Sequence, residues 1–115
     1  MVYDEGKQRI IQEYVPGKQV TLSHVIASPV DEVYDQLGLS HDGAIGILTL
    51  TPGETAVIAG DIATKAADVR IGFLDRFTGA VFITGDVAAV TQSLQAINRY
   101  LEETLGYSPA PLTKS

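Results

Sequence analysis

The chain has 115 residues, 14 acidic against eight basic side chains, a formal net charge of −6 and no cysteine. This length predicts a single domain, and the absence of cysteine excludes disulfides, thiolate catalysis and thiolate metal sites. The scattered basic residues argue against nucleic-acid binding, which needs a basic stripe. No apolar run approaches the ~20 residues of a membrane span, and the first residues lack an apolar signal core. We therefore expect a cytoplasmic protein whose partners include neither nucleic acid nor membrane.

Two strands are expected at the start of the chain. The first covers 9–15 (RIIQEYV) and is ended by the turn signal Pro16-Gly17. The second covers 19–27, where alternation predicts one buried face, formed by Val20, Leu22, His24 and Ile26. His24 is interpreted as a half-buried, hydrogen-bonded histidine rather than a metal ligand, because buried polar groups are usually satisfied.

Capping signals predict three helices. The first has Ser28 as its N-cap, Pro29 at the first helical position and Gly38 at its left-handed end. The second opens on a capping box over 51–54, and its expected apolar stripe is Val57, Ile58, Ile62 and Ala66. The third runs from Asp86 to Gly106 along a stripe that recurs every three or four residues, comprising Val87, Val90, Leu94, Ile97, Leu101 and Leu105.

Three more strands are expected between these helices, over 43–50, 68–74 and 80–85, the last two forming a hairpin. The order β-β-α-β-α-β-β-α predicts an α/β fold, a mixed sheet covered by helices. The tail over 108–115 contains two prolines and is not expected to be helical.

No motif for catalysis, cofactor binding or metal binding emerges from the residues. Ser40, His41 and Asp42 have the residue types of a hydrolase triad, but neighbours in a loop cannot form the relay, so a surface turn is expected. Asp61 and Lys65 form a solvated i,i+4 pair in which Lys65 also suits a helix C-terminus.

The segment GFLDRFTGAV (72–81) sets Asp75 and Arg76 at the tip of the hairpin, with Thr78-Gly79 supplying the turn. These two side chains could form an acid/base pair, but nothing else in the chain supplies a nucleophile or a metal to work with them. An enzyme is therefore disfavoured.

Three stretches, RIIQEYVPGKQVTLSH, AIGILTLTPGETAVIAGDIATKAADVRIGFLDRFTGAV and the closing TKS, resemble the circularly permuted shell proteins of bacterial microcompartments, of the EutS and PduU type, over roughly residues 9–107. The resemblance implies an α/β (α+β), ferredoxin-like shell domain over 19–107, in which the family's last strand and helix have moved to the front. An N-terminal extension (1–18) precedes it and a tail (108–115) follows. It also implies a cyclic homohexamer that tiles the coat around encapsulated enzymes. The expected partners are further copies, other shell proteins and the encapsulated enzymes, in the shell of a cytoplasmic microcompartment.

The resemblance also assigns roles to individual residues. The hairpin loop would line the six-fold axis, with Phe77, Thr78 and Gly79 at the pore rim, where the bulky Phe77 argues for a narrowed or capped pore. Asp75 and Arg76 would then pair across a subunit boundary, and Lys65 would lie at the edge between hexamers. The Ala27-Ser28-Pro29 corner lacks an arginine that ordinary members often carry there. The sequence therefore does not determine how neighbouring hexamers pack along this edge.

The N-terminal strand would form, with five copies of itself, a small parallel β-barrel over the axis. Its residues Ile10, Ile11, Gln12, Glu13 and Tyr14 alternate, and the set that faces inward is left open. Closing six strands into a barrel would remove every unpaired edge. Gly43 could permit a bent rather than a flat ring, because glycine tolerates unusual backbone angles. The pathway served, whether of ethanolamine, propanediol, choline or another substrate, is also left open.

Two other classes of function compete with a shell protein. An oligomeric regulatory domain that binds a small metabolite could share the fold, although it has no need of the N-terminal strand. An enzyme that uses Asp75 and Arg76 at a subunit interface is the third hypothesis.

Overall fold

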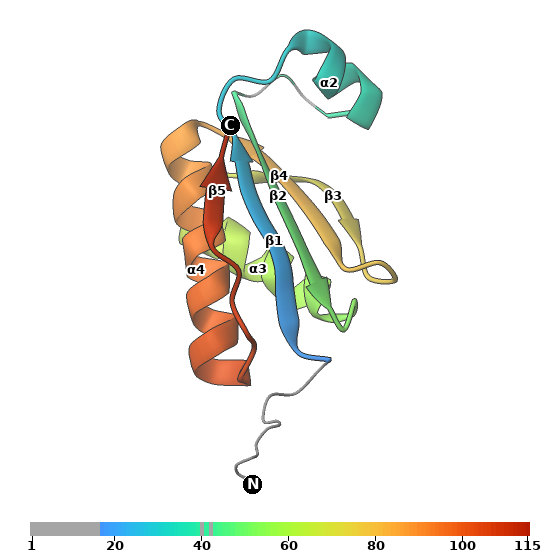
Figure 1. The fold of residues 1–115 in the computed structure, drawn as a ribbon. Coiled ribbons are helices and arrows are strands. Elements are labelled where there is room, and N and C mark those ends of the chain that lie inside the picture. The colour runs from blue at the N-terminus through green and yellow to red at the C-terminus, as the bar shows by residue number, and fades with distance from the viewer. Residues whose placement is uncertain (1–16, 40, 42) are drawn as a thin grey trace, which may run out of the picture.

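The computed structural model describes residues 17–39, 41 and 43–115 (Figure 1). The strand predicted over 9–15 lies outside the described residues. The elements in chain order are β1 (Gln19–Ile26), α2 (Asp31–Leu37), β2 (Ala44–Thr51), α3 (Thr55–Ala66), β3 (Arg70–Asp75), β4 (Ala80–Gly85), α4 (Val87–Leu105) and β5 (Leu112–Lys114). The four other predicted strands and the three predicted helices are all present, which confirms the α/β class.

The strands form one five-stranded mixed sheet in the order β3-β4-β2-β1-β5. The pairs β1–β2, β2–β4 and β3–β4 are antiparallel, and β5 runs parallel to β1. Helices α3 and α4 pack on one face of the sheet. Helix α2 packs on the other face and covers only one end of it, as Figure 1 shows at the top of the view.

The main core lies between the sheet and the helices α3 and α4. The predicted stripe of α4 is confirmed, since Val90, Leu94, Ile97 and Leu101 are buried in this core. Both predicted ends of α4 are also confirmed. Asp86 accepts a hydrogen bond from the Ala89 backbone N–H at 2.8 Å, and Gly106 is left-handed with φ 73°.

The predicted apolar face of α3 is confirmed at Ile62, which packs against the main core, but it is wrong at Val57 and Ile58. Val57 and Ile58 are 54% and 42% exposed, whereas Ala56, Ala59 and Ala63 are fully buried. The helix lies so close to the sheet that only small residues fit beneath it, and a Cβ added to Gly60 would come within 2.7 Å of a Leu74 methyl carbon. Small side chains therefore lie directly beneath the helix, and Val57 and Ile58 remain exposed.

Two predicted N-caps are also wrong. Helix α2 begins at Asp31 with Val30 at the cap position, so Ser28 does not cap it. Thr51 ends β2 instead of capping α3, whose cap position is Glu54 without a side-chain hydrogen bond. The C-terminal signal of α2 is confirmed, since Gly38 is left-handed with φ 68°.

The predicted buried face of β1 is wrong beyond its second residue. Val20 pairs with Leu50 but Leu22 pairs with Thr49, so a β-bulge lies between Val20 and Leu22. The extra residue shifts the alternation by one, which turns every following side chain to the opposite face. Ser23 and Val25 are consequently buried on the face of the sheet that contacts the main core, and Leu22 is exposed on the other face.

The tail over 108–115 is not helical, as predicted, but it also pairs with the sheet. Strand β5 lies beside β1, and the Val20 backbone N–H donates to the Ser108 carbonyl at 2.9 Å. The Asn98 side chain holds the segment between them, donating to the Ala110 carbonyl at 2.7 Å. Among the helices of the described residues, none is both long and apolar enough to cross a membrane.

Candidate functional site

The loop between β3 and β4 is shaped by the Asp75 carboxylate. Its Oδ1 accepts hydrogen bonds from the backbone N–H groups of Phe77 at 2.9 Å and Thr78 at 3.4 Å, and its Oδ2 accepts one from the Thr78 hydroxyl at 2.9 Å. The Phe77 N–H and the Thr78 hydroxyl lower the pKa of the Asp75 carboxyl, because they stabilise its charged form. Asp75 is therefore ionised at neutral pH, and its carboxylate oxygens accept hydrogen bonds from residues of its own turn.

Two glycines fix this loop against its neighbours. Gly79 has φ 78°, and its N–H donates to the Asp75 carbonyl at 2.8 Å while its carbonyl accepts from the Leu50 N–H at 2.9 Å. A Cβ at Gly53, in the turn between β2 and α3, would overlap the Arg76 carbonyl oxygen. The hairpin tip thus has a defined conformation and does not swing freely.

The loop presents an apolar ring and a cation to the outside. Phe77 is 83% exposed, and the Arg76 guanidinium carbon lies 4.9 Å from the centre of its ring, a cation–π contact. Asp75 and Arg76 do not form an ion pair with each other, because the carboxylate is occupied by the turn. Within the described residues, no group of three or more side chains could hold a metal ion. The geometry gives the acid/base hypothesis for this pair no support.

Lys65 lies in the last turn of α3, as predicted. Its Nζ is 2.9 Å from the Asp61 Oδ2, and both side chains are exposed. Side chains of α4 satisfy the carbonyl groups at this end of α3. The Ser93 hydroxyl donates to the Ala63 carbonyl at 2.8 Å, and the Gln92 amide donates to the Ala66 carbonyl at 3.0 Å.

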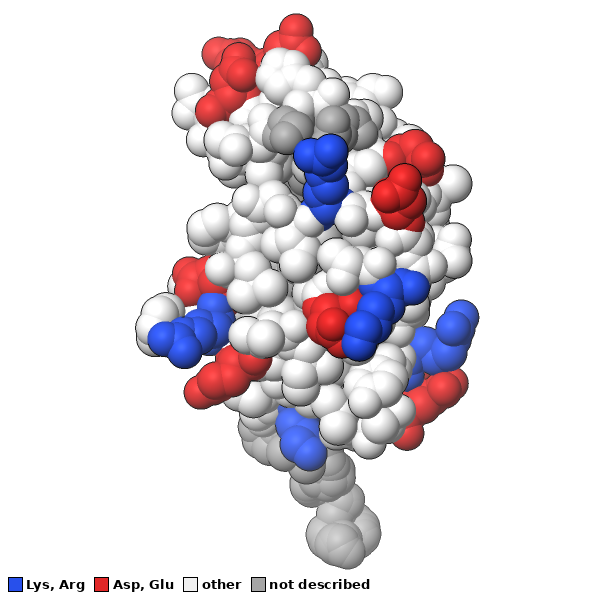
Figure 2. Space-filling view, turned by 180° about the vertical axis from the view of Figure 1, so that it is seen from behind, with Lys and Arg blue, Asp and Glu red and all other residues white. Residues whose placement is uncertain are grey.

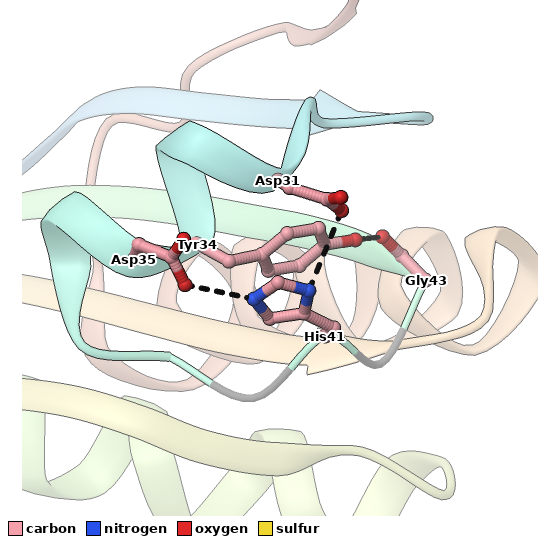
Figure 3. Close-up of polar contacts among 5 residues, drawn as sticks. All are labelled: Asp31, Tyr34, Asp35, His41 and Gly43. Carbon is pink, nitrogen blue, oxygen red and sulfur yellow. Dashed lines mark hydrogen bonds and ion pairs between the residues drawn. The ribbon is translucent and has the colours of Figure 1, made fainter.

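A polar cluster at the other face of the sheet joins α2 to the segment that leads into β2 (Figure 3). The His41 Nε2 is 3.0 Å from the Asp35 Oδ1, and its Nδ1 is 3.4 Å from the Asp31 Oδ1. The imidazole also stacks on the Tyr34 ring with 4.5 Å between centroids, and the Tyr34 hydroxyl donates to the Gly43 carbonyl.

The contacts of this cluster tie α2 to the segment that precedes β2. The His41 ring lies between the two carboxylates, so that each nitrogen faces one of them (Figure 3). Sequence reasoning predicted only a surface turn here and missed the two aspartates. The available signal was their i,i+4 spacing, which places Asp31 and Asp35 on one face of α2. Ser40 and Asp42 lie outside the described residues.

His24 is half-buried and hydrogen-bonded through both ring nitrogens, which confirms its interpretation. Its Nδ1 is 2.6 Å from the Thr113 hydroxyl and its Nε2 is 2.8 Å from the Ser115 hydroxyl. Because the Thr113 hydroxyl donates to the Ser23 carbonyl at 3.3 Å, it accepts its second hydrogen bond from Nδ1–H. His24 therefore ties β5 to β1.

The family model of the BMC domain matches residues 44–110. Across the full length of both chains, this chain is 57% identical to the bacterial microcompartment shell protein CutR of Streptococcus intermedius. It is 59% identical to the shell protein EutS of Escherichia coli K12 over 95% of this chain and 98% of that one. A solved CutR flat hexamer superposes with a TM-score of 0.85 at 57% identity, covering 94% of this chain and 100% of that chain. The family model begins at β2, so β1 and α2 precede it although β1 lies between β2 and β5 in the sheet.

Proposed function

Because this chain belongs to the BMC-domain family of bacterial microcompartment shell proteins, in its circularly permuted form, we propose that six copies form a ring that tiles the polyhedral coat around encapsulated enzymes. The observation that carries the proposal is the similarity to CutR, whose subunit has the same fold over nearly the whole chain and occurs in a flat hexamer. The family is one of structural shell proteins and not of enzymes. In the permuted order, β1 and α2 are the strand and helix that have moved to the front.

We propose that Phe77, Thr78 and Gly79 form the rim of a narrow axial pore. The Phe77 side chain is 83% exposed to water in the single chain. Its apolar surface would be partly buried if six copies of the loop gathered around an axis, which favours that arrangement. The fixed conformation of the loop supports this role, since a rim needs six identical tips. Arg76 has no ion pair within the described part of the chain, so it is available to a neighbouring subunit, whereas Asp75 holds the turn from which Arg76 projects.

A cap over this pore is proposed for the N-terminal strand, in which Ile10, Ile11, Gln12, Glu13 and Tyr14 would build a six-stranded barrel. The sheet register supports its location. Gln19 pairs with Thr51, and Thr49 pairs with Ala80, so β1 starts at the same end of the sheet as the β3–β4 loop. The first residue of β1, Gln19, therefore lies on the side of the proposed axis.

Light scattering on the full chain and on a variant that lacks residues 1–15 tests these proposals. We expect a hexamer in both cases, built from the 12.2-kDa chain for the full protein and from a lighter chain for the variant, because the domain itself carries the ring contacts. A full chain that stays monomeric across micromolar concentrations would contradict the ring. Collapse of only the shortened variant to monomers would show that the barrel, and not the domain interface, holds the ring together.

Lys65 is proposed to lie at the edge where hexamers meet, and other shell proteins and the encapsulated enzymes are proposed as further partners. The support for the edge position is the exposure of Lys65 at the end of a helix whose last turn is held rigidly by α4.

A further inference from the structure

His41 contacts two carboxylates at once, one through each ring nitrogen (Figure 3). Its Nε2 lies 3.0 Å from the Asp35 Oδ1, and its Nδ1 lies 3.4 Å from the Asp31 Oδ1. An ionised carboxylate only accepts hydrogen bonds, so both contacts need a donor on the ring. A neutral imidazole carries one N–H group, whereas the imidazolium carries two. Both contacts are therefore satisfied together only when His41 is protonated.

The histidine of β1 has partners that make no such demand. The His24 ring nitrogens lie 2.6 Å from the Thr113 hydroxyl and 2.8 Å from the Ser115 hydroxyl. A hydroxyl both donates and accepts, so a neutral ring with one N–H group satisfies both contacts. The two histidines thus differ in the chemistry of their partners, and His24 serves as an internal reference for His41.

The turn after α2 holds His41 beside the helix. Gly38 is left-handed with φ 68°, and the Leu39 N–H donates to the Tyr34 carbonyl at 2.9 Å. The Leu39 side chain is buried in a small cluster with Tyr34 and Ile45. The imidazole stacks on the Tyr34 ring with 4.5 Å between the centroids. A His41 ring that left the carboxylates would also lose this stacking contact.

Further charged side chains lie on the elements around this segment, on a surface where both signs of charge are interspersed (Figure 2). Glu32 is exposed on α2. Beside Gly43, Arg70 of β3 and Asp86 at the end of β4 line a polar hollow. The Asp86 carboxylate caps α4, where it accepts a hydrogen bond at 2.8 Å. The two carboxylates and the phenol ring that contact the His41 imidazole all belong to α2, so its protonation acts on the attachment of that helix.

We propose that His41, Asp31 and Asp35 form a proton-dependent latch that fixes α2 to the segment leading into β2. The protonated ring donates to both carboxylates, whereas the neutral ring turns a lone pair toward one of them, which is repulsive. Aspartates are ionised above about pH 4, and histidines lose their proton between about pH 5 and 8. The latch is therefore closed at about pH 5.5 and opens as the pH rises through the histidine range. All its groups lie in one chain, so the inference does not depend on the proposed ring.

Opening the latch loosens one wall of an apolar groove on this face of the sheet. Helix α2 forms that wall, and the sheet contributes Ile26, Ile47 and Phe82 to the groove. Tyr34 is buried, whereas the other residues of α2 are exposed or half-buried. The helix thus has little apolar burial of its own, and the protonation state of His41 sets how firmly it is held beside the groove.

Amide hydrogen exchange of the full chain over 31–37 tests the latch. The rates are measured at about pH 5.5 and about pH 8, on either side of most histidine titrations, and each is divided by the intrinsic rate of an unfolded chain at that pH. We expect the α2 amides to be about threefold more protected at the lower pH, a modest factor because exposed ion pairs are weak. The amides of β5, beside His24, should gain no protection at the lower pH.

Three variants separate the latch from other effects of pH. His41→Phe keeps a ring on Tyr34 but removes both nitrogens, so α2 should be protected equally at both pH values. In Asp35→Asn the side-chain amide donates to Nε2, so that a neutral ring satisfies both contacts and α2 stays protected at the higher pH. Glu32→Gln is the matched control, because it removes an acid of α2 that is exposed, and it should keep the wild-type dependence on pH.

Several results would overturn the latch. In the wild type, these are an α2 protection that is the same at both pH values and one that changes equally in α4. A dependence on pH that persists in His41→Phe would assign it to another group. Protection of α2 in Asp35→Asn that falls at the higher pH as in the wild type would show that the donors on the ring do not decide the attachment.

Discussion

The two faces of the sheet are built very differently. On one face, α3 and α4 close over a continuous core in which Ile83, Leu94 and Ile97 are almost completely buried. On the other face, α2 buries only Tyr34, over a small cluster with Leu39 and Ile45. Beside that cluster an apolar groove of about 480 Å³ stays open, lined by Ile26, Glu32, Val33, Gln36, Leu37, Ile47 and Phe82. The comparison indicates that the stability of the domain comes mainly from the first face, and that α2 is held by a few side-chain contacts.

The largest expected effect comes from removing one leucine from each face. Leu94 is 1% exposed and Leu37 is 42% exposed. Leu94→Ala leaves a cavity in the closed core and should lower the free energy of unfolding by about 3 kcal/mol, whereas Leu37→Ala should lower it by less than about 1 kcal/mol. Chemical denaturation at a matched protein concentration measures both, since assembly contributes to apparent stability. Equal losses would show that the two faces contribute alike.

A smaller effect is expected where α2 is attached. Tyr34→Phe removes the hydroxyl that donates to the Gly43 carbonyl and should cost about 1 kcal/mol. Because α2 is held by few contacts, amide exchange should quicken over 31–37 and stay unchanged in α4 and β4. Tyr100→Phe, at an exposed position of α4, is the control and should change neither. A uniform increase in exchange over the whole domain would mean that α2 is no separate unit.

A matched pair of serines tests the closed face. Ser23 and Ser93 are both fully buried, but only Ser93 has a partner within the described residues, since it donates to the Ala63 carbonyl at 2.8 Å. Ser93→Ala should therefore cost about 1 kcal/mol of unfolding free energy. Ser23→Ala removes an unsatisfied hydroxyl and should leave stability unchanged or raise it by up to about 1 kcal/mol. Thermal denaturation compares the two, and a destabilising Ser23→Ala would reveal a partner for that hydroxyl.

The smallest effect concerns the β3–β4 loop, which we propose as the pore rim, and its dependence on pH. The native pKa of Asp75 is lowered, chiefly by the Phe77 N–H and the Thr78 hydroxyl. Its contribution to stability is therefore full above the ordinary carboxyl pKa of about 4 and is lost only as the pH falls through the lower native value. Exchange of the Phe77 and Thr78 amides should stay slow at pH 5 in the wild type and be faster in Asp75→Asn. Loss of this protection already at pH 5 in the wild type would contradict the assigned hydrogen bonds.

Sequence patterns predicted those elements that depend on local signals. The periodicity of α4, its Asp86 cap and its Gly106 end are properties of neighbouring residues, and all were correct. The local capping signals at Ser28 and Thr51 were nevertheless wrong. The other errors arise where distant contacts decide. The bulge after Val20 depends on pairing with β2, the buried face of α3 depends on how closely that helix approaches the sheet, and β5 depends on the free edge of β1.

The residues of the candidate site divide in the same way, into those that local patterns predict and those whose positions depend on distant contacts. The Asp61–Lys65 pair followed from spacing alone, whereas His24 is half-buried and hydrogen-bonded as predicted but on the face opposite to Val20, with partners in the C-terminal segment. The position of Asp31 and Asp35 on either side of His41 did not, because it requires the chain to turn back after α2. The roles proposed for Phe77, Thr78 and Gly79 came from the resemblance to shell proteins, since the chemistry of these three residues alone does not indicate a pore.

Crosslinking at the proposed axis tests the central claim most directly. The chain contains no cysteine, so Phe77→Cys supplies one thiol per chain at the proposed rim, and Val30→Cys supplies one at an exposed position before α2. With a short bifunctional thiol reagent applied to dilute hexamers, we predict that Phe77→Cys yields covalently linked chains within one ring and that Val30→Cys stays mainly single. Hexamers of Phe77→Cys whose thiols react only singly would show that the β3–β4 loops do not meet at the axis, and the account of the pore would be wrong.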